Sequence, residues 1–130
     1  EAQGAEDVTI VSYGIMIWQA HKAAWELSKR GINARVVKLD KICPLDCGEA
    51  LESLAVSKRL VVCEDVCAQG CIGEKLLAEA ELRGTAIKGA KLLNLGQGVI
   101  PQGTVGELMA DCGVDAAAIV KAAEDLAGEA

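Results

Sequence analysis

The chain has 130 residues, of which 52% are hydrophobic and 25% charged, so it has room for one domain with one core. Nineteen acidic residues outnumber thirteen scattered basic ones, and this net charge of −6 argues against binding to nucleic acid or to an anionic membrane. No apolar run approaches the ~18–20 residues of a membrane span, and the acidic first residues lack the features of a signal peptide, so we expect a cytoplasmic protein.

Four short apolar runs predict β-strands. They span Val8 to Tyr13, Ala34 to Leu39, Arg59 to Glu64, and Ala90 to Leu95. Each is rich in β-branched residues or leucine, and segments with helical spacing follow the first three. This alternation predicts right-handed βαβ units, and therefore an α/β fold whose parallel sheet is covered by helices on both faces.

The first helix is expected from Ile15 to Arg30, and Gly31 closes it. His21 is the only histidine of the chain. It lies within the apolar arc of this helix, between Ile17 and Trp25, so we interpret it as a packed side chain rather than a catalytic one. Without a second histidine or a G-x-S-x-G motif, nucleophilic hydrolysis has no support.

Four further helices are predicted, each from its own start or stop signal. The first is opened by a capping-box variant, Asp46 with Glu49, and the second runs from about Gly70 to Leu82 and ends near Gly84. The third is a short helix capped by Thr104 with Glu107. The last starts at Asp115 and turns Ile119, Ala123 and Leu126 inward. There is no internal repeat or linker. We therefore expect a loose segment over residues 1–6 and a single domain over residues 7–130.

Several residues fall at the carboxyl ends of the predicted strands, where open α/β sheets bind ligands. The candidates for a crevice or anion site are Tyr13, Gly14, Glu64, Asp65, Gly70 and Gly73. The two later glycines open a helix, whose backbone N–H groups could face an anion, but tight packing of helix on strand is the favoured explanation. The two adjacent carboxylates point in different directions if the strand continues, so we prefer a capping role for them.

Six cysteines raise the question of a metal site. Cys63, Cys67 and Cys71 are spaced four apart, as are Cys43 and Cys47, whereas zinc and iron–sulfur sites usually contain C-x₂-C pairs. We interpret the cysteines as core or incidental residues and assign no metal ligand. The chain also lacks the G-x-G-x-x-G and G-x-x-x-x-G-K-[ST] phosphate-binding motifs.

Three segments, taken in order, resemble a known family. They read DVTIVSYG with a helix ending KRGINARVVKLDKICPLD, then LVVCEDVCAQGCIGEKLLAE, and then LLNLG leading to QGTVGELMADCGVDAAAI. Over roughly Asp7 to Ala123 the chain resembles the C-terminal domain of transketolase-like, thiamine-diphosphate-dependent enzymes, and within them the 1-deoxy-D-xylulose-5-phosphate synthases most closely.

The resemblance implies a three-layer α/β/α fold whose mainly parallel sheet has the strand order 2-1-3-4. In the family an antiparallel edge strand precedes the segment that starts here at Asp7, which implies a truncated chain. The family's G-G-F-G becomes Gly70-Cys71-Ile72-Gly73, the loop after Gly96 lacks the customary Asp, and Gln102 replaces a typical H-G pair. These departures do not favour a ligand role for that loop.

The resemblance also implies a function for the parent enzyme, the decarboxylative condensation of pyruvate with glyceraldehyde 3-phosphate in isoprenoid precursor biosynthesis. Thiamine diphosphate and Mg²⁺ belong to the preceding domains of such enzymes, which are expected to be homodimers. We therefore expect a structural and interface lobe that is inactive alone and holds no catalytic or cofactor-binding residue. Two alternatives stay open: the C-terminal domain of a transketolase or of a 2-oxoacid dehydrogenase β subunit, and a free-standing module that binds small anions.

Overall fold

The computed structural model describes residues 6–96 and 103–128, and within them the four predicted strands form one sheet. The strands are β1 (Val8–Ser12), β2 (Ala34–Lys38), β3 (Arg59–Cys63) and β4 (Gly89–Leu93). Every neighbouring pair is parallel and the order is β2-β1-β3-β4. The predicted parallel sheet and its strand order are therefore confirmed.

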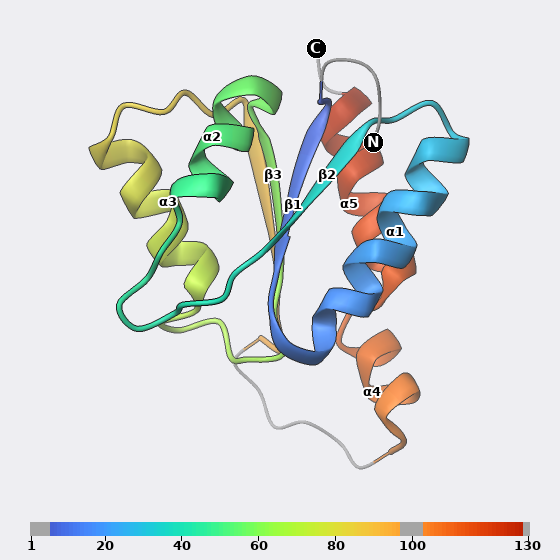
Figure 1. The fold of residues 1–130 in the computed structure, drawn as a ribbon. Coiled ribbons are helices and arrows are strands. Elements are labelled where there is room, and N and C mark those ends of the chain that lie inside the picture. Colours follow the sequence, from blue (N-terminus) through green and yellow to red (C-terminus); the bar gives the residue numbers. More distant parts are fainter. Residues whose placement is uncertain (1–5, 97–102, 129–130) are drawn as a thin grey trace.

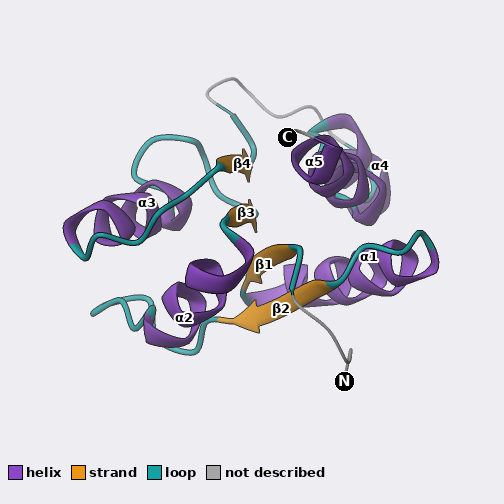
Figure 2. Cartoon of the chain, turned by 90° about the horizontal axis from the view of Figure 1, so that it is seen from above, coloured by secondary structure: helices purple, strands orange, loops and turns teal. Residues whose placement is uncertain are grey.

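The helices form a layer on each side of this sheet. They are the short 3₁₀ helix η1 (Gly14–Met16) and the α-helices α1 (Ile17–Lys29), α2 (Gly48–Ser57), α3 (Ile72–Leu82), α4 (Val105–Asp111) and α5 (Ala116–Gly128). Figures 1 and 2 show α1 and α5 on one face and α2 and α3 on the other, which is the predicted three-layer arrangement. None of the described helices is long and apolar enough to span a membrane.

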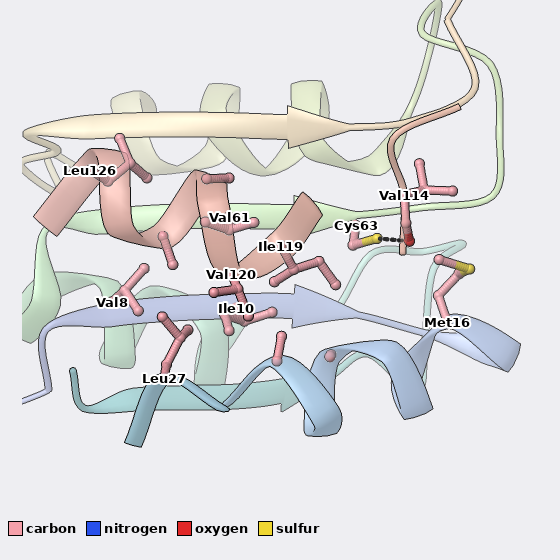
Figure 3. Close-up of a cluster of buried hydrophobic side chains, with 14 residues drawn as sticks. Val8, Ile10, Met16, Leu27, Val61, Cys63, Val114, Ile119, Val120 and Leu126 are labelled. Carbon is pink, nitrogen blue, oxygen red and sulfur yellow. Dashed lines mark hydrogen bonds between the residues drawn. The ribbon is translucent and has the colours of Figure 1, made fainter. Parts of the chain in front are cut away.

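Each face of the sheet has its own aliphatic core, because successive strand residues point to opposite faces. Toward α1 and α5 the sheet directs Val8, Ile10 and Val61, which pack around Leu27 and Ile119 (Figure 3). The opposite core is built around a second set of buried residues, which includes Val11, Leu60, Val62, Leu54 and Leu76. The strands are therefore apolar on both faces, as expected for a parallel sheet between two helical layers.

Two of the predicted helix starts are confirmed. Thr104 and Glu107 form a complete capping box at the start of α4. At α5, the Asp115 carboxylate accepts a hydrogen bond from the Ala118 N–H, and the three residues expected to face inward on this helix are buried. Side-chain caps satisfy N–H groups that have no partner within the first helical turn.

The capping box predicted at Asp46 and Glu49 is wrong. Helix α2 begins at Gly48, Cys47 is its N-cap, and no side chain caps it. Asp46 belongs instead to the preceding turn, where its N–H donates to the Lys41 carbonyl. The chain closes this turn before it enters the helix, and that moves the helix start two residues beyond the predicted cap.

The interpretation of His21 as a packed side chain is also wrong, because His21 is exposed and so is its neighbour Trp25. Helix α1 buries Ala20 and Leu27, which belong to the predicted apolar arc, together with Ala23. Small residues on the buried face let a helix lie close to its neighbours, and a tryptophan there would hold it away. Packing volume, more than hydrophobicity, sets the orientation of this helix.

Residues 1–5, and with them most of the predicted loose segment, lie outside the described residues, as do Gly98 and Gln102. Glu6 is included and accepts a hydrogen bond from Ser53. Ser53 in turn shares a hydrogen bond with Thr9, a buried polar residue of β1. These hydroxyl groups satisfy one another beneath α2, as buried polar groups must.

Replacing Leu54 with alanine should destabilise the domain by about 2–5 kcal/mol, because Leu54 is fully buried between α2 and the sheet. Leu82→Ala is the matched control, since that leucine is 80% exposed and its truncation should change stability by less than about 0.5 kcal/mol. Urea unfolding followed by circular dichroism measures both. Equal effects of the two changes would contradict the described core.

Candidate functional site

The candidate residues lie where β1 and β3 end side by side. The helix that follows β1 covers one face of the sheet and the helix that follows β3 covers the other, so this is the topological switch point of the fold (Figure 2). Tyr13 directly follows β1 and Glu64 directly follows β3. The Tyr13 hydroxyl donates a hydrogen bond of 2.8 Å to Oε1 of Glu64. The structure thus brings together two of the residues predicted to share this crevice.

Glu64 is the central group of the site. Only 1% of the residue is exposed, and both carboxylate oxygens accept hydrogen bonds. Oε1 accepts the Ile72 N–H at 2.7 Å in addition to the Tyr13 hydroxyl, and Oε2 accepts the Gly73 N–H at 2.9 Å. The carboxylate therefore occupies the N-terminus of α3, where the orphan N–H groups and the helix dipole favour a negative charge.

The environment of Glu64 changes the titration of its neighbours. Burial raises the pKa of the Tyr13 phenol, and the hydrogen bond to Glu64 and the charge of Glu64 add to this increase. Burial also raises the pKa of the Cys71 thiol; a hydrogen bond from the Glu74 backbone opposes this increase, and the charges of Glu64 and Glu74 add to it. Both groups accordingly remain protonated at neutral pH, and the phenol serves as a proton donor rather than as a base.

The glycines of the site have different roles. A Cβ on Gly73 would lie 2.6 Å from Cδ2 of Leu92 and 3.3 Å from Oε2 of Glu64, so this position has no room for a side chain. Gly70 has a φ of +70° and its N–H donates to Glu74. Gly14 has a φ of +62° in an open turn. Close packing of α3 against the sheet, the favoured explanation, accounts for Gly73.

Asp65 lies near Tyr13, where its charge helps to raise the pKa of the phenol, but its own side chain is on the surface. Asp65 is exposed, whereas the adjacent Glu64 is buried, so the two carboxylates do not form a pair. This agrees with the alternation of side chains along an extended segment. The hydrogen bonds of Glu64 could not be read from the sequence, because its partners come from two separate segments of the chain. Two adjacent acidic residues at the end of an apolar strand were the one available signal.

The cysteines do not gather at this site. Cys63 is buried, its thiol donates to the Val114 carbonyl at 3.3 Å, and burial raises its pKa to about 12 (Figure 3). Cys43 and Cys67 are exposed. In the described ranges no three histidine, cysteine or acidic side chains are grouped so that they could hold a metal ion. The Cys63 thiol therefore fits a packing role better than a nucleophilic one.

These residues do not fit thiamine diphosphate with Mg²⁺. A diphosphate needs backbone or cationic donors that face it, and Mg²⁺ needs carboxylate or carbonyl oxygens with free coordination positions. The N–H groups at the start of α3 already donate to Glu64, and both oxygens of Glu64 already accept hydrogen bonds. The Tyr13, Ile72 and Gly73 donors of this site are therefore already paired with Glu64.

Glu64→Ala should destabilise the domain by about 1–3 kcal/mol, because it leaves two buried N–H groups and the Tyr13 hydroxyl without their acceptor. Asp65→Ala changes an exposed carboxylate next to it and should shift stability by less than about 0.5 kcal/mol. Chemical denaturation of both variants measures the difference. A stable Glu64→Ala variant would show that the carboxylate is not a structural cap.

Gly73→Ala should cost about 1–3 kcal/mol, since the added methyl group overlaps the Leu92 side chain. Gly106 in α4 provides the control because a Cβ there meets nothing within 4 Å, so Gly106→Ala should be neutral or slightly stabilising. Thermal unfolding of the two variants tests this contrast. A neutral Gly73→Ala variant would place α3 further from β4 than described.

Comparison with known proteins gives the same family as the fold. The family model "Transketolase, C-terminal domain" matches residues 1–119. The chain is 32% identical over 122 residues to a 1-deoxy-D-xylulose-5-phosphate synthase of Geobacter sulfurreducens, covering 92% of the chain and 19% of the synthase. It is 37% identical over 73 residues to the pyruvate dehydrogenase E1 β subunit of Bacillus subtilis, covering 56% of the chain and 22% of that subunit.

Among solved structures, a split-gene transketolase in an inactive beta4 tetramer matches with a TM-score of 0.83 and 29% identity, covering 95% of this chain and 40% of that one. A transketolase from Campylobacter jejuni matches with a TM-score of 0.64 at 15% identity, a similarity of fold alone, over 93% of this chain and 17% of that one. The chain thus spans about a fifth of the length of the synthases it matches. With its parallel sheet in the order 2-1-3-4, the chain belongs to the transketolase C-terminal domain family.

Proposed function

We propose that this chain is the C-terminal domain of a thiamine-diphosphate-dependent enzyme of the 1-deoxy-D-xylulose-5-phosphate synthase type. The observation that carries the proposal is the extent of the match. Synthases from three organisms align with 92–95% of the chain at 32% identity. The dehydrogenase β subunit of Bacillus subtilis aligns with 56% of it.

In this proposal the domain has a structural and interface role and performs no chemistry alone. The only buried carboxylate among the described residues is Glu64, and its oxygens are used to hold Tyr13 and the start of α3. Tyr13, Gly14, Glu64, Asp65, Gly70 and Gly73 then serve the fold rather than a ligand. A free-standing anion-binding module loses its main support, because the N–H groups available to an anion are already engaged.

The parent enzyme would condense pyruvate with glyceraldehyde 3-phosphate and release carbon dioxide. Thiamine diphosphate and Mg²⁺ would be held by its other domains, and the parent would be a cytoplasmic homodimer. The contribution of this chain would be to keep those domains in place through its rigid sheet and its two helical layers. A stable scaffold is consistent with a core in which Val8, Ile10 and Leu54 are fully buried.

A second candidate is the C-terminal domain of a β subunit in a two-subunit enzyme of the same family. It is favoured by local identity: 45% over 60 residues with the β subunit of acetoin:2,6-dichlorophenolindophenol oxidoreductase from Cupriavidus necator. The similarity to a split-gene transketolase points the same way. In that case the complete protein would need a partner subunit for activity.

Calorimetric titration of the isolated chain with thiamine diphosphate and Mg²⁺ should give no binding heat, since the N–H and hydroxyl donors at the Glu64 site are already engaged. The complete product of the gene should bind the cofactor and release carbon dioxide from pyruvate only when glyceraldehyde 3-phosphate is present. Micromolar binding by the isolated chain would refute the structural role. Activity that requires an added α subunit, with another acceptor, would favour the second candidate.

A further inference from the structure

Both tryptophans of the chain are exposed on the same helix. Trp18 is 71% exposed and Trp25 is 65% exposed, and their spacing of seven positions places both on one face of α1. The chain has only one other aromatic residue, Tyr13. Tryptophan is the side chain with the largest apolar surface to bury, so two exposed ones on one face indicate a surface that is covered in the assembled protein.

Trp25 forms one wall of a groove between α1 and α5 with a volume of about 450 Å³. Ala116, Ala117 and Val120 of α5 also line it, and the ion pair of Arg30 with Glu124 joins the end of α1 to α5. Figures 1 and 2 show these two helices side by side on one face of the sheet. We call this concave surface the Trp25 groove. A tryptophan and small apolar residues bordered by charged side chains are typical of a protein interface.

The charges around the Trp25 groove differ in sign from the chain as a whole. Lys22 and Lys121 line it and make no ion pair within the described residues. The Lys29 ammonium lies 3.4 Å from the centre of the Trp25 ring. Three basic residues, Lys22, Arg30 and Lys121, line the groove with two acidic ones, on a chain whose net charge is −6. This surface is therefore complementary to an acidic partner.

The opposite layer has no comparable surface. Its large exposed hydrophobic residues are Val56 near the end of α2 and Leu82 at the end of α3, and neither is aromatic. Isolated exposed aliphatic residues are normal on protein surfaces. The two helical layers thus differ, and the difference singles out the layer formed by α1 and α5.

We propose that the Trp25 groove is the docking surface for the thiamine-diphosphate-binding part of the parent enzyme. That part inserts into the groove an apolar side chain that is flanked by carboxylates. The inference rests on the proposed function, and it adds which face of the domain carries the contact and what chemistry the partner surface has. The size of the relatives supports this occupant, since about four fifths of each synthase lies outside the matched region.

Hydroxyl-radical footprinting with mass spectrometry tests the proposal on the complete product of the gene, with any subunit that copurifies, and on the isolated chain as reference. Oxidation of Trp25 should fall several-fold in the complete enzyme, while oxidation of Leu82 should not change. Protection of Leu82 with Trp25 unchanged would overturn the proposal. Protection of Trp25 in the isolated chain that grows with its concentration would overturn it too, because the occupant would then be a second copy.

A pair of variants separates docking from a role within the domain. Trp25→Glu should lower the melting temperature of the complete enzyme by several degrees and leave that of the isolated chain unchanged, because the side chain is exposed there. Leu82→Glu should change neither. An equal loss in both proteins would show that Trp25 acts within the domain. Cofactor-dependent turnover of the same wild-type preparation tests the proposed function separately, and its absence would not affect the footprint.

Discussion

The fold depends on one buried carboxylate that joins three elements. Glu64 follows β3, receives the Tyr13 hydroxyl from the end of β1, and accepts the first N–H groups of α3. An ionised carboxylate without partners costs many kcal/mol inside a protein, so these donors must be present whenever the domain is folded. Gly73 makes the arrangement possible, because any larger residue would push α3 away from Leu92 and from the carboxylate.

The strands and the sheet could be predicted because their signal is local. Each observed strand agrees with its predicted range to within a residue or two, since runs of β-branched residues and leucine are read directly from the sequence. The order of the strands followed from family resemblance, because pairing between distant segments leaves no local trace. The caps at Thr104 and Asp115 were predictable for the same reason as the strands, since each acts within four residues of itself.

The features that could not be predicted depend on side-chain volume and on contacts between residues far apart in the sequence. The apolar pattern of α1 suggests that Trp25 and His21 face inward, but the close approach of this helix to its neighbours favours Ala20 and Ala23. The contact of Tyr13 with Glu64 joins residues 51 positions apart. A sequence pattern indicates that both lie at the carboxyl edge of the sheet, and only the structure shows that they satisfy each other.

The occupied start of α3 and the exposed aromatic face of α1 are the two observations that support the proposed structural role. The claim on which this account depends is that the Glu64 carboxylate permanently occupies the start of α3. Amide hydrogen exchange measured by NMR tests it most directly. The N–H groups of Ile72 and Gly73 should exchange only through global unfolding and should keep their chemical shifts when thiamine diphosphate and Mg²⁺ are added. Rapid exchange of these amides, with shifts that follow the cofactor concentration, would contradict the account.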